Sequence, residues 1–362
     1  MQKSTELSCA SDISPKEIEM LEEIIRHYDF CTVSVEKIRS AYKLRTDKGD
    51  FCLKRVSHGY VKARKSYALS CYLRENGFDN TAEYYKSKNG KAIIKNKDAA
   101  YYITLWIEGR EASFSRMADI LRCARLLAEF HHKAKAFKAP KHVKMKEHTK
   151  KWGKSFKRCK EDLEGFMEHI DKLKLKSDFD YKYRDSVDIF RSEAEFSLEI
   201  LKHSRYEEMC RYYREEGYVC HDSFYYQNII IDKSEKLYIV DLESSQYDIP
   251  VSDLGKLLRR VLSKKRYLWD FDLCRRIIEE YGKEHPLARE EYELLLSILV
   301  FPHKFWKLGK KKYIRNKKWN EAKYVKKLRR LLRERKYKQE FILCYITFYC
   351  LDIIYEPYMI EI

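Results

Sequence analysis

Residues 219–231 read VCHDSFYYQNIII, and this stretch decides the fold more than any other part of the sequence. His221 and Asn228 stand seven residues apart, and the apolar run that follows Asn228 is typical of a buried strand. A short DKSE turn joins it to a second apolar run, which ends at Asp241. An amide oxygen and a carboxylate oxygen are ligands that suit Mg²⁺. We therefore expect Asn228 and Asp241 to form a metal site.

The rest of the chain surrounds this hairpin with a definite order of elements. The N-terminal part alternates strand-like runs with one helix, and helical periods dominate after residue 115. This order is typical of the α+β protein kinase-like bilobal fold, with a small antiparallel β lobe and a large, mainly helical lobe. The pattern predicts strands at 31–35, 39–46, 51–56 and 101–107, and helices at 15–28, 60–75, 115–131, 150–174 and 180–214.

Three regions follow from this order. We expect an N-terminal helical segment, a kinase-like N-lobe with one embedded helix, and a helical C-lobe that carries the hairpin and a basic C-terminal region. Their expected bounds are 1–30 for the first, 31–105 for the second and 106–362 for the third, with the hairpin at 219–243 and the basic region at 304–338.

Lys54 is the candidate cation for nucleotide phosphates, because it ends an inward-facing strand of the small lobe. Two features usual beside such a lysine are missing. No glycine-rich loop lies between the first strands, where residues 36–41 read EKIRSA. The helix at 60–75 has no acidic residue before Glu75, so the sequence predicts no ion-pair partner for Lys54 there.

Several segments together resemble the CotS-type spore coat proteins, which share the fold of aminoglycoside phosphotransferases and choline kinases. The resemblance rests on residues 44–56, 106–110, 220–231, 239–260 and 301–307. It implies residence in the spore coat, with the mother-cell cytoplasm as the site of synthesis, and binding of ATP and Mg²⁺. It also implies site residues: Lys54, Leu105, Trp106 and Ile107 for the nucleotide, Asn228 and Asp241 for the metal, and His221, Asp222 and Ser223 for the catalytic loop.

The catalytic loop departs from that family at one position. Ser223 stands where the resemblance implies the catalytic aspartate, and the carboxylate is displaced by one residue to Asp222. Loss of a general base typically lowers a rate by ~10²–10⁴-fold. The favoured interpretation is a catalytically impaired kinase-like protein that acts in coat assembly through binding. The alternative is an active phosphotransferase that uses Asp222 as base on a small-molecule or glycan hydroxyl.

The charge of the chain suggests an anionic partner. Its 74 Lys and Arg against 56 Asp and Glu give a net charge of +18, and residues 304–338 alone hold seventeen Lys and Arg against two acids. Such a surface suits an acidic coat protein or an anionic coat polymer, although it could also be only a solvated face. Nucleic acid ranks last because no binding motif accompanies the charge. Aromatic residues interleave with the basic ones: Trp306, Tyr313, Trp319, Tyr324 and Tyr337.

Composition excludes other classes of protein. Hydrophobic residues make up 44% of the chain, which argues against wholesale disorder. The first residues contain no apolar signal segment, and the apolar run at 341–351 is too short to span a bilayer. The eleven cysteines lack zinc spacing, so we expect free thiols and no structural zinc.

Overall fold

The computed structural model describes residues 8–9, 13–57, 59–97, 99–141, 143 and 145–355. They form two compact units. Unit 1 contains the chain up to residue 112, together with 133–146 and 221–246, and unit 2 contains 113–132, 147–220 and the chain from 247 onward. The hairpin after Asn228 therefore belongs to the same unit as the N-terminal strands.

Unit 1 is built on a seven-stranded sheet and a smaller three-stranded sheet. Its strands are β1 (Ser8–Cys9), β2 (Thr32–Ile38), β3 (Ala41–Thr46), β4 (Gly49–Ser57), β5 (Tyr84–Tyr85), β6 (Ile94–Asn96), β7 (Ala99–Leu105), β8 (Gly109–Glu111), β10 (Ile229–Asp232) and β11 (Leu237–Ile239). Its helices are α1 (Pro15–Ile25), α2 (Tyr60–Glu75) and the short turns η2 (Tyr226–Asn228) and η3 (Leu242–Ser244).

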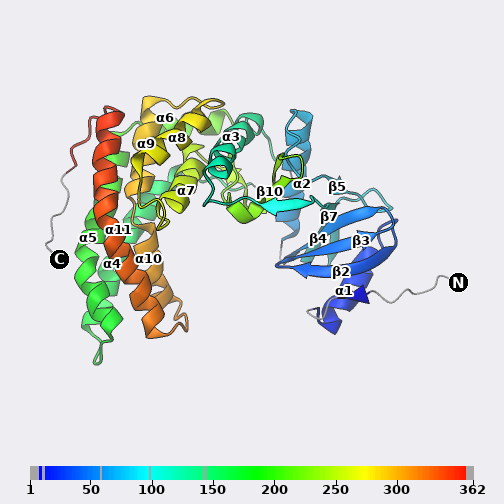
Figure 1. Ribbon diagram of the computed structural model, residues 1–362, viewed down its shortest axis with the longest axis horizontal. Helices are drawn as coiled ribbons and strands as arrows, with labels where there is room; N and C mark the ends of the chain where they lie inside the picture. The colour runs from blue at the N-terminus through cyan, green and yellow to red at the C-terminus, as the bar shows by residue number, and fades with distance from the viewer. Residues whose placement is uncertain are drawn as a thin grey trace. The chain divides into compact units, whose positions relative to one another are not determined.

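The large sheet runs in the order β1-β2-β3-β4-β7-β5, with β6 also paired to β7 (Figure 1). Among the described residues of this sheet, β1 and β2 pair in parallel and the other strand pairs are antiparallel. Alternation along β4 separates two faces: Phe51 and Leu53 pack into the apolar core that α1 covers, whereas Cys52 and Lys54 point to the opposite face. Strand pleating thus aims Lys54 away from that core.

The small sheet joins the hairpin of β10 and β11 to β8, in the order β11-β10-β8. The sequence predicts the hairpin but not its third strand. Gly109 permits this pairing, because a Cβ at that position would lie 2.2 Å from the carbonyl oxygen of Ile231. The segment that follows β7 is thereby bound directly to the strand that follows Asn228.

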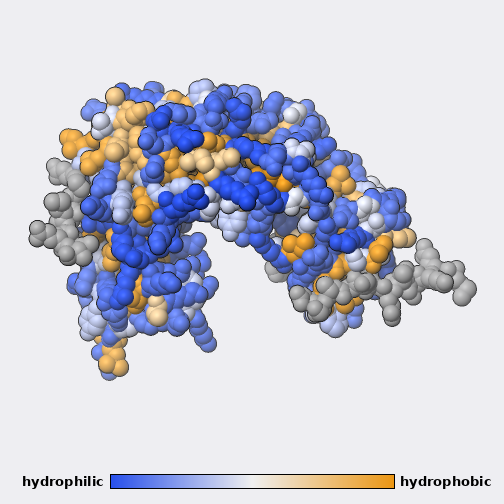
Figure 2. Space-filling view, viewed as in Figure 1, coloured by the Kyte–Doolittle hydropathy of each residue, from blue (hydrophilic) through white to orange (hydrophobic). Residues whose placement is uncertain are grey.

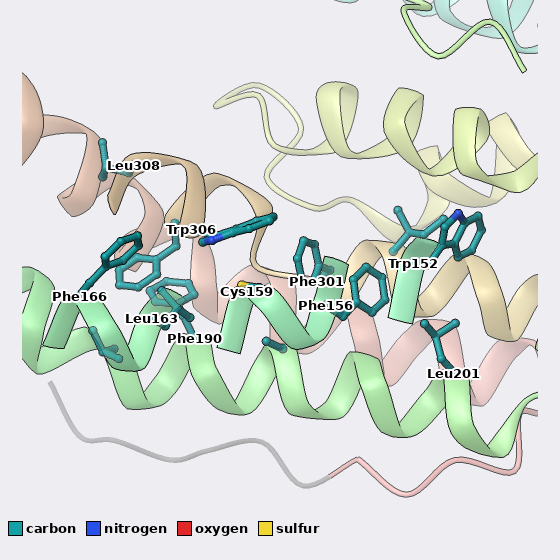
Figure 3. Packing of buried hydrophobic residues seen from close by; sticks show 14 of the residues in the cluster. Trp152, Phe156, Cys159, Leu163, Phe166, Phe190, Leu201, Phe301, Trp306 and Leu308 are labelled. Carbon is teal, nitrogen blue, oxygen red and sulfur yellow. The ribbon is translucent and has the colours of Figure 1, made fainter. Parts of the chain in front are cut away.

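Unit 2 is mainly helical. Its longest helices, α4, α5 and α11, run beside one another, and their apolar faces share one core (Figure 1). Figure 3 shows aromatic side chains of this core, among them Phe156 and Phe301, whose stacked rings have centroids 4.3 Å apart.

The helices and strands of unit 2 are α3 (Met117–Lys133), η1 (Thr149–Lys151), α4 (Trp152–Asp171), α5 (Asp178–His203), α6 (Tyr206–Glu215), β9 (Val219–Cys220), α7 (Val251–Leu262), α8 (Phe271–Gly282), α9 (Arg289–Val300), α10 (His303–Gly309), the π-helical turn η4 (Lys310–Ile314) and α11 (Glu321–Phe348). The short strand β12 (Gln246–Tyr247) has its first residue in unit 1 and its second in unit 2.

The single helix predicted over 180–214 is wrong, because the structure has two helices there. The first, α5, ends at His203, and the next residue, Ser204, has an extended backbone with ψ 163°. The break lets Tyr206 turn toward Trp152, with ring centroids 5.6 Å apart, and donate a hydrogen bond to the carbonyl oxygen of Thr149. No glycine or proline marks the break, so tertiary packing rather than local sequence sets it.

The observed architecture confirms the expected α+β class, with an antiparallel sheet in the N-terminal region and a mostly helical remainder. Among the helices of the described residues, none has the length and apolarity that crossing a bilayer requires. Hydrophilic residues cover most of the face shown in Figure 2. The cysteines whose side chains are described are free thiols.

Replacing Gly109 by alanine should destabilise the protein by about 1–3 kcal/mol, because its Cβ would collide with backbone rather than with a movable side chain. Urea unfolding of the two proteins measures the difference. Gly165→Ala in α4 is the matched control, because nothing lies within 4 Å of its added Cβ; it should stabilise by about 0.5–1 kcal/mol. Equal behaviour of the two variants would contradict the role given to Gly109.

Candidate functional site

Lys54 is held in place by the register of the large sheet. It pairs across the ladder with Tyr102 on β7, so both side chains leave the sheet on the same face. The Nζ atom of Lys54 lies 2.5 Å from Oδ1 of Asp241 and 3.1 Å from Oε1 of Glu243. The strand lysine and the hairpin aspartate that the sequence singled out are therefore in direct contact.

Glu243 is the functional residue that sequence reasoning missed. The sequence predicted no ion-pair partner for Lys54 on the helix at 60–75; the structure supplies one on η3 instead. Glu243 is buried and also accepts a 2.5 Å hydrogen bond from the Tyr102 hydroxyl. The available signal was its position two residues after Asp241, which puts both carboxylates at the end of the same hairpin.

The two carboxyl groups differ in proton affinity. Burial and the hydrogen bond with Asp241 raise the pKa of Glu243 to about 7. Burial also opposes ionisation of Asp241, but the hydrogen bond with Glu243 and the charge of Lys54 outweigh it and lower its pKa. Burial would lower the pKa of Lys54, yet the two acids raise it. Asp241 thus keeps its charge beside the Lys54 ammonium, and Glu243 is the member of the pair that takes up a proton.

Lys65 occupies the inner face of α2, where the sequence shows no acid. Its side chain is 6% exposed, and Nζ donates a hydrogen bond of 2.5 Å to the carbonyl oxygen of Ser245. Burial lowers the pKa of Lys65 to about 8, although Glu243 acts in the opposite direction. The helix therefore contributes a second cation, not a carboxylate, and Lys54 depends on Glu243 and Asp241 for neutralisation.

Hydrogen bonds to backbone atoms connect the residues at the two ends of the hairpin. The side-chain amide of Asn228 donates to the carbonyl oxygen of Ser223 at 2.9 Å, and the Asn228 carbonyl oxygen accepts from the Val240 amide at 3.0 Å. His221 is fully buried, with Nε2 3.2 Å from the Val240 carbonyl oxygen. Asp241 has a left-handed backbone, φ +69°. These contacts hold Asn228 close to Asp241.

A cavity of about 360 Å³ within unit 1 collects most of the expected ligand-binding residues. The expected catalytic residues His221, Asp222 and Ser223 do not line it. Asp222 instead lines a second recess of about 350 Å³, which shares Lys54 and Asp241 with the first. Asp222 has a left-handed backbone, φ +65°. The expected residues that line the first cavity are Lys54, Leu105, Trp106, Ile107, Asn228 and Asp241.

The wall formed by residues 105–107 is braced from outside the cavity. The backbone amide of Leu105 donates to the backbone carbonyl oxygen of Glu83, and that of Trp106 donates to the backbone carbonyl oxygen of Asp50. The Nζ atom of Lys43 lies 4.8 Å from the centroid of the Trp106 ring and 3.0 Å from the Asp50 carboxylate. This segment, held by these contacts, therefore presents a largely apolar wall to the cavity.

The turn between β2 and β3 lies at the same cavity. It consists of Arg39 and Ser40, and Arg39 takes a left-handed backbone, φ +56°, without a glycine. Arg39 forms an ion pair with Glu111 on β8, and both residues line the cavity. A two-residue turn held by an ion pair therefore replaces the flexible glycine-rich loop that the sequence lacks.

Unit 2 holds a buried cluster that sequence spacing does not reveal. Ligand-type atoms of His131, Cys220 and Asp253 all lie within 4.8 Å of one another, and all three residues are buried. The partners of this cluster lie inside the same unit: Tyr281 hydroxyl is 2.7 Å from His131 Nδ1, and Lys256 Nζ is 3.3 Å from Asp253. These contacts provide hydrogen-bond and ion-pair partners for the polar atoms of this buried cluster.

The fold is that of the protein kinase-like phosphotransferases. An aminoglycoside phosphotransferase from Alicyclobacillus acidocaldarius subsp. acidocaldarius DSM 446 superposes with a TM-score of 0.78 at 20% identity, over 91% of this chain and 96% of that one. Spectinomycin phosphotransferase APH(9)-Ia, solved with ADP and spectinomycin, superposes with a TM-score of 0.62 at 13% identity, over 91% and 97% of the two chains. At these identities the likeness establishes the fold.

The chain belongs to the family described as "Spore coat putative kinase YutH", whose model matches residues 21–344. Spore coat protein S of Bacillus subtilis (strain 168) is 25% identical over 332 residues, which cover 90% of this chain and 93% of that protein. The resemblance to spore coat proteins with a phosphotransferase fold is thereby confirmed.

The buried state of Lys65 predicts a specific pH dependence of stability. Its pKa is about 8 in the folded protein and ~10.4 in an unfolded chain. Between these values the unfolded state binds more protons, so Lys65 makes the wild-type protein more stable as pH rises through this window. Lys65→Met removes that dependence. The free energy of unfolding of wild type should therefore rise by roughly 3 kcal/mol relative to that of Lys65→Met from pH 8 to 10.5.

Denaturant titrations across that pH range measure the difference. Lys62→Met is the matched control, because Lys62 is an exposed lysine on the same helix. The difference in unfolding free energy between Lys62→Met and wild type should stay constant across this pH range. A pH-independent gap for Lys65→Met would show that Lys65 is not desolvated.

Proposed function

We propose that the cavity of unit 1 binds ATP with Mg²⁺, and that this protein serves in the spore coat mainly through binding, with phosphoryl transfer impaired. Membership of the spore coat family supports the coat setting. The proposed place of synthesis is the mother-cell cytoplasm, and the proposed partners are other coat proteins or an anionic coat polymer.

The residues that line the cavity fit such a ligand. Asn228 uses its amide nitrogen on Ser223, so its amide oxygen and the Asp241 carboxylate form a hard donor set for Mg²⁺. Lys54 provides the cation for phosphate oxygens, and Glu243 with Tyr102 holds that cation in position. ATP, when bound, would supply the phosphoryl group, and Mg²⁺ would neutralise its charge.

The observation that carries the impairment is the position of the loop carboxylate. Ser223 offers only a neutral hydroxyl, which is a poor proton acceptor near neutral pH. Asp222, the carboxylate next to it, lines the second recess and not the cavity with Asn228 and the 105–107 wall. This arrangement supports binding without efficient activation of an acceptor hydroxyl.

One observation favours an active phosphotransferase instead. The second recess brings Asp222 to the same space as Lys54 and Asp241. If a small-molecule or glycan acceptor binds there, Asp222 is the candidate base. The two functions make opposite predictions for variants of Asp222 and Ser223.

Binding of ATP should raise the melting temperature only when Mg²⁺ is present. A ligand at a hundredfold excess over its Kd stabilises the folded state by about 2.7 kcal/mol. The shift should disappear in Asp241→Ala, because this change removes the metal carboxylate. Asp272→Ala removes an exposed acid on α8 and should keep the full shift. Absence of any shift with millimolar ATP and Mg²⁺ would refute nucleotide binding.

Restoring the missing carboxylate should raise activity. We expect Ser223→Asp to increase ATP turnover by ~10²-fold or more, since a positioned base contributes ~10²–10⁴-fold. Asp222→Asn should leave the low wild-type rate unchanged. Measuring released ADP over long incubations tests both variants. A rate that is already substantial in wild type and collapses in Asp222→Asn would instead establish Asp222 as the base of an active enzyme.

A further inference from the structure

Unit 2 contains a small recess in which all the ionisable lining residues are cationic. We call it the lysine recess. It has a volume of about 240 Å³ and lies between α10, η4 and α11. Leu308, Leu331 and Trp319 form its uncharged wall. Its charged lining residues are Lys304, Lys307, Lys311, Lys327 and Arg330.

Among the described residues, the structure shows an acidic ion-pair partner for one of these five cations. Arg330 forms an ion pair with Glu334 at 2.6 Å. Within the described part of the chain, the structure shows no ion pair for the recess lysines at 304, 307, 311 and 327. The lysine recess therefore concentrates positive charge that no ion pair among the described residues compensates, apart from that of Arg330.

Trp319 gathers further lysines around its ring. The Nζ atoms of Lys311, Lys323, Lys317 and Lys327 lie 4.7, 4.9, 5.1 and 5.3 Å from the ring centroid. Each cation–π contact at an exposed site is worth only ~0.5–1 kcal/mol. The ammonium groups lie within about 10 Å of one another, which is about one Debye length at 0.1 M salt, so their mutual repulsion is only partly screened.

The titration behaviour of the recess agrees with this picture. Burial, together with the charges of Lys307, Lys317 and Lys327, lowers the pKa of Lys311. Burial lowers the pKa of Lys304 to about 8, with Arg330 acting in the same direction and Glu334 against it. An anion in the recess would relieve this repulsion.

We propose that the lysine recess binds a soluble oligophosphate, a short chain of linked phosphoryl groups. Lysine is a mobile point charge with three donors, so several lysines adapt to the oxygens of successive phosphoryl groups. The recess is smaller than the ~300–1,000 Å³ of most drug-sized pockets, which suits a compact ligand of high charge density. This site is separate from the cavity of unit 1 and does not depend on nucleotide binding there.

The same geometry disfavours nucleic acid. Stacking of bases needs accessible aromatic faces. Trp306 and Tyr324 are buried in the core, and the Tyr313 hydroxyl is bonded to Asp180. The lysines described above surround the ring of Trp319. The aromatic residues that interleave with the basic sequence thus serve mainly in packing, and only Tyr337 among them is exposed.

Calorimetric titration of the full chain with sodium tripolyphosphate at low salt tests the proposal. Lys307→Gln/Lys311→Gln should weaken binding at least tenfold. Lys202→Gln/Lys336→Gln removes the same charge from exposed positions that do not line the recess and should change affinity less than twofold. Equal weakening by both pairs would mean diffuse attraction and overturn the site. Tighter binding of an oligo-aspartate peptide with the same charge would overturn the ligand class.

Tripolyphosphate could also enter the cavity of unit 1, so its place of binding needs a direct measurement. Acetylation of lysines in wild-type protein, followed by peptide mass spectrometry, locates it without any variant. We expect tripolyphosphate to protect Lys304, Lys307 and Lys311 several-fold, and to leave Lys202 and Lys336 unprotected. Protection confined to Lys54 would assign the ligand to the cavity of unit 1 and overturn the proposal.

Discussion

The partly buried contact of Lys54 with Asp241 and the buried Glu243 is the interaction on which the rest of unit 1 depends. A lysine on an inward strand face costs several kcal/mol unless acids neutralise it. The helix beside it carries Lys65 instead of an acid, so neutralisation comes from the hairpin. This requirement ties β4 to the end of β11 and explains why Tyr102, opposite Lys54 in the sheet, donates to Glu243.

Local signals in the sequence were sufficient for much of this architecture. The helix predicted over 60–75 has the bounds of α2, Tyr60–Glu75. It ends where Asn76 and Gly77 follow, and Gly77 has the positive φ of +77° that is typical of a residue after a helix C-terminus. The order of the hairpin likewise follows from apolar runs and one turn. Contacts between distant residues had no such signal: Lys54 and Glu243 are 189 positions apart. The end of α5 at His203 was not predicted for a related reason, because packing around Tyr206 determines it.

The basic charge divides into structural and accessible parts. Lys338 is buried and bonded to Glu193 and to the Val300 carbonyl oxygen, so it holds α11 against the helices around it. The recess lysines have no such partners among the described residues. The sequence count of seventeen basic residues could not separate these groups, because the division depends on which side of α11 each residue occupies. Net charge alone therefore overstates the surface available to an anionic partner.

The sharing of Lys54 and Asp241 by two recesses has a thermodynamic consequence. An occupant of either space alters the charge that the other occupant meets, so the two binding free energies are linked. Linkage is reciprocal: the factor by which the first ligand changes the affinity of the second equals the factor in the reverse direction. In a protein with this arrangement, the concentration of one ligand sets the affinity for the other, even without transfer of a group between them.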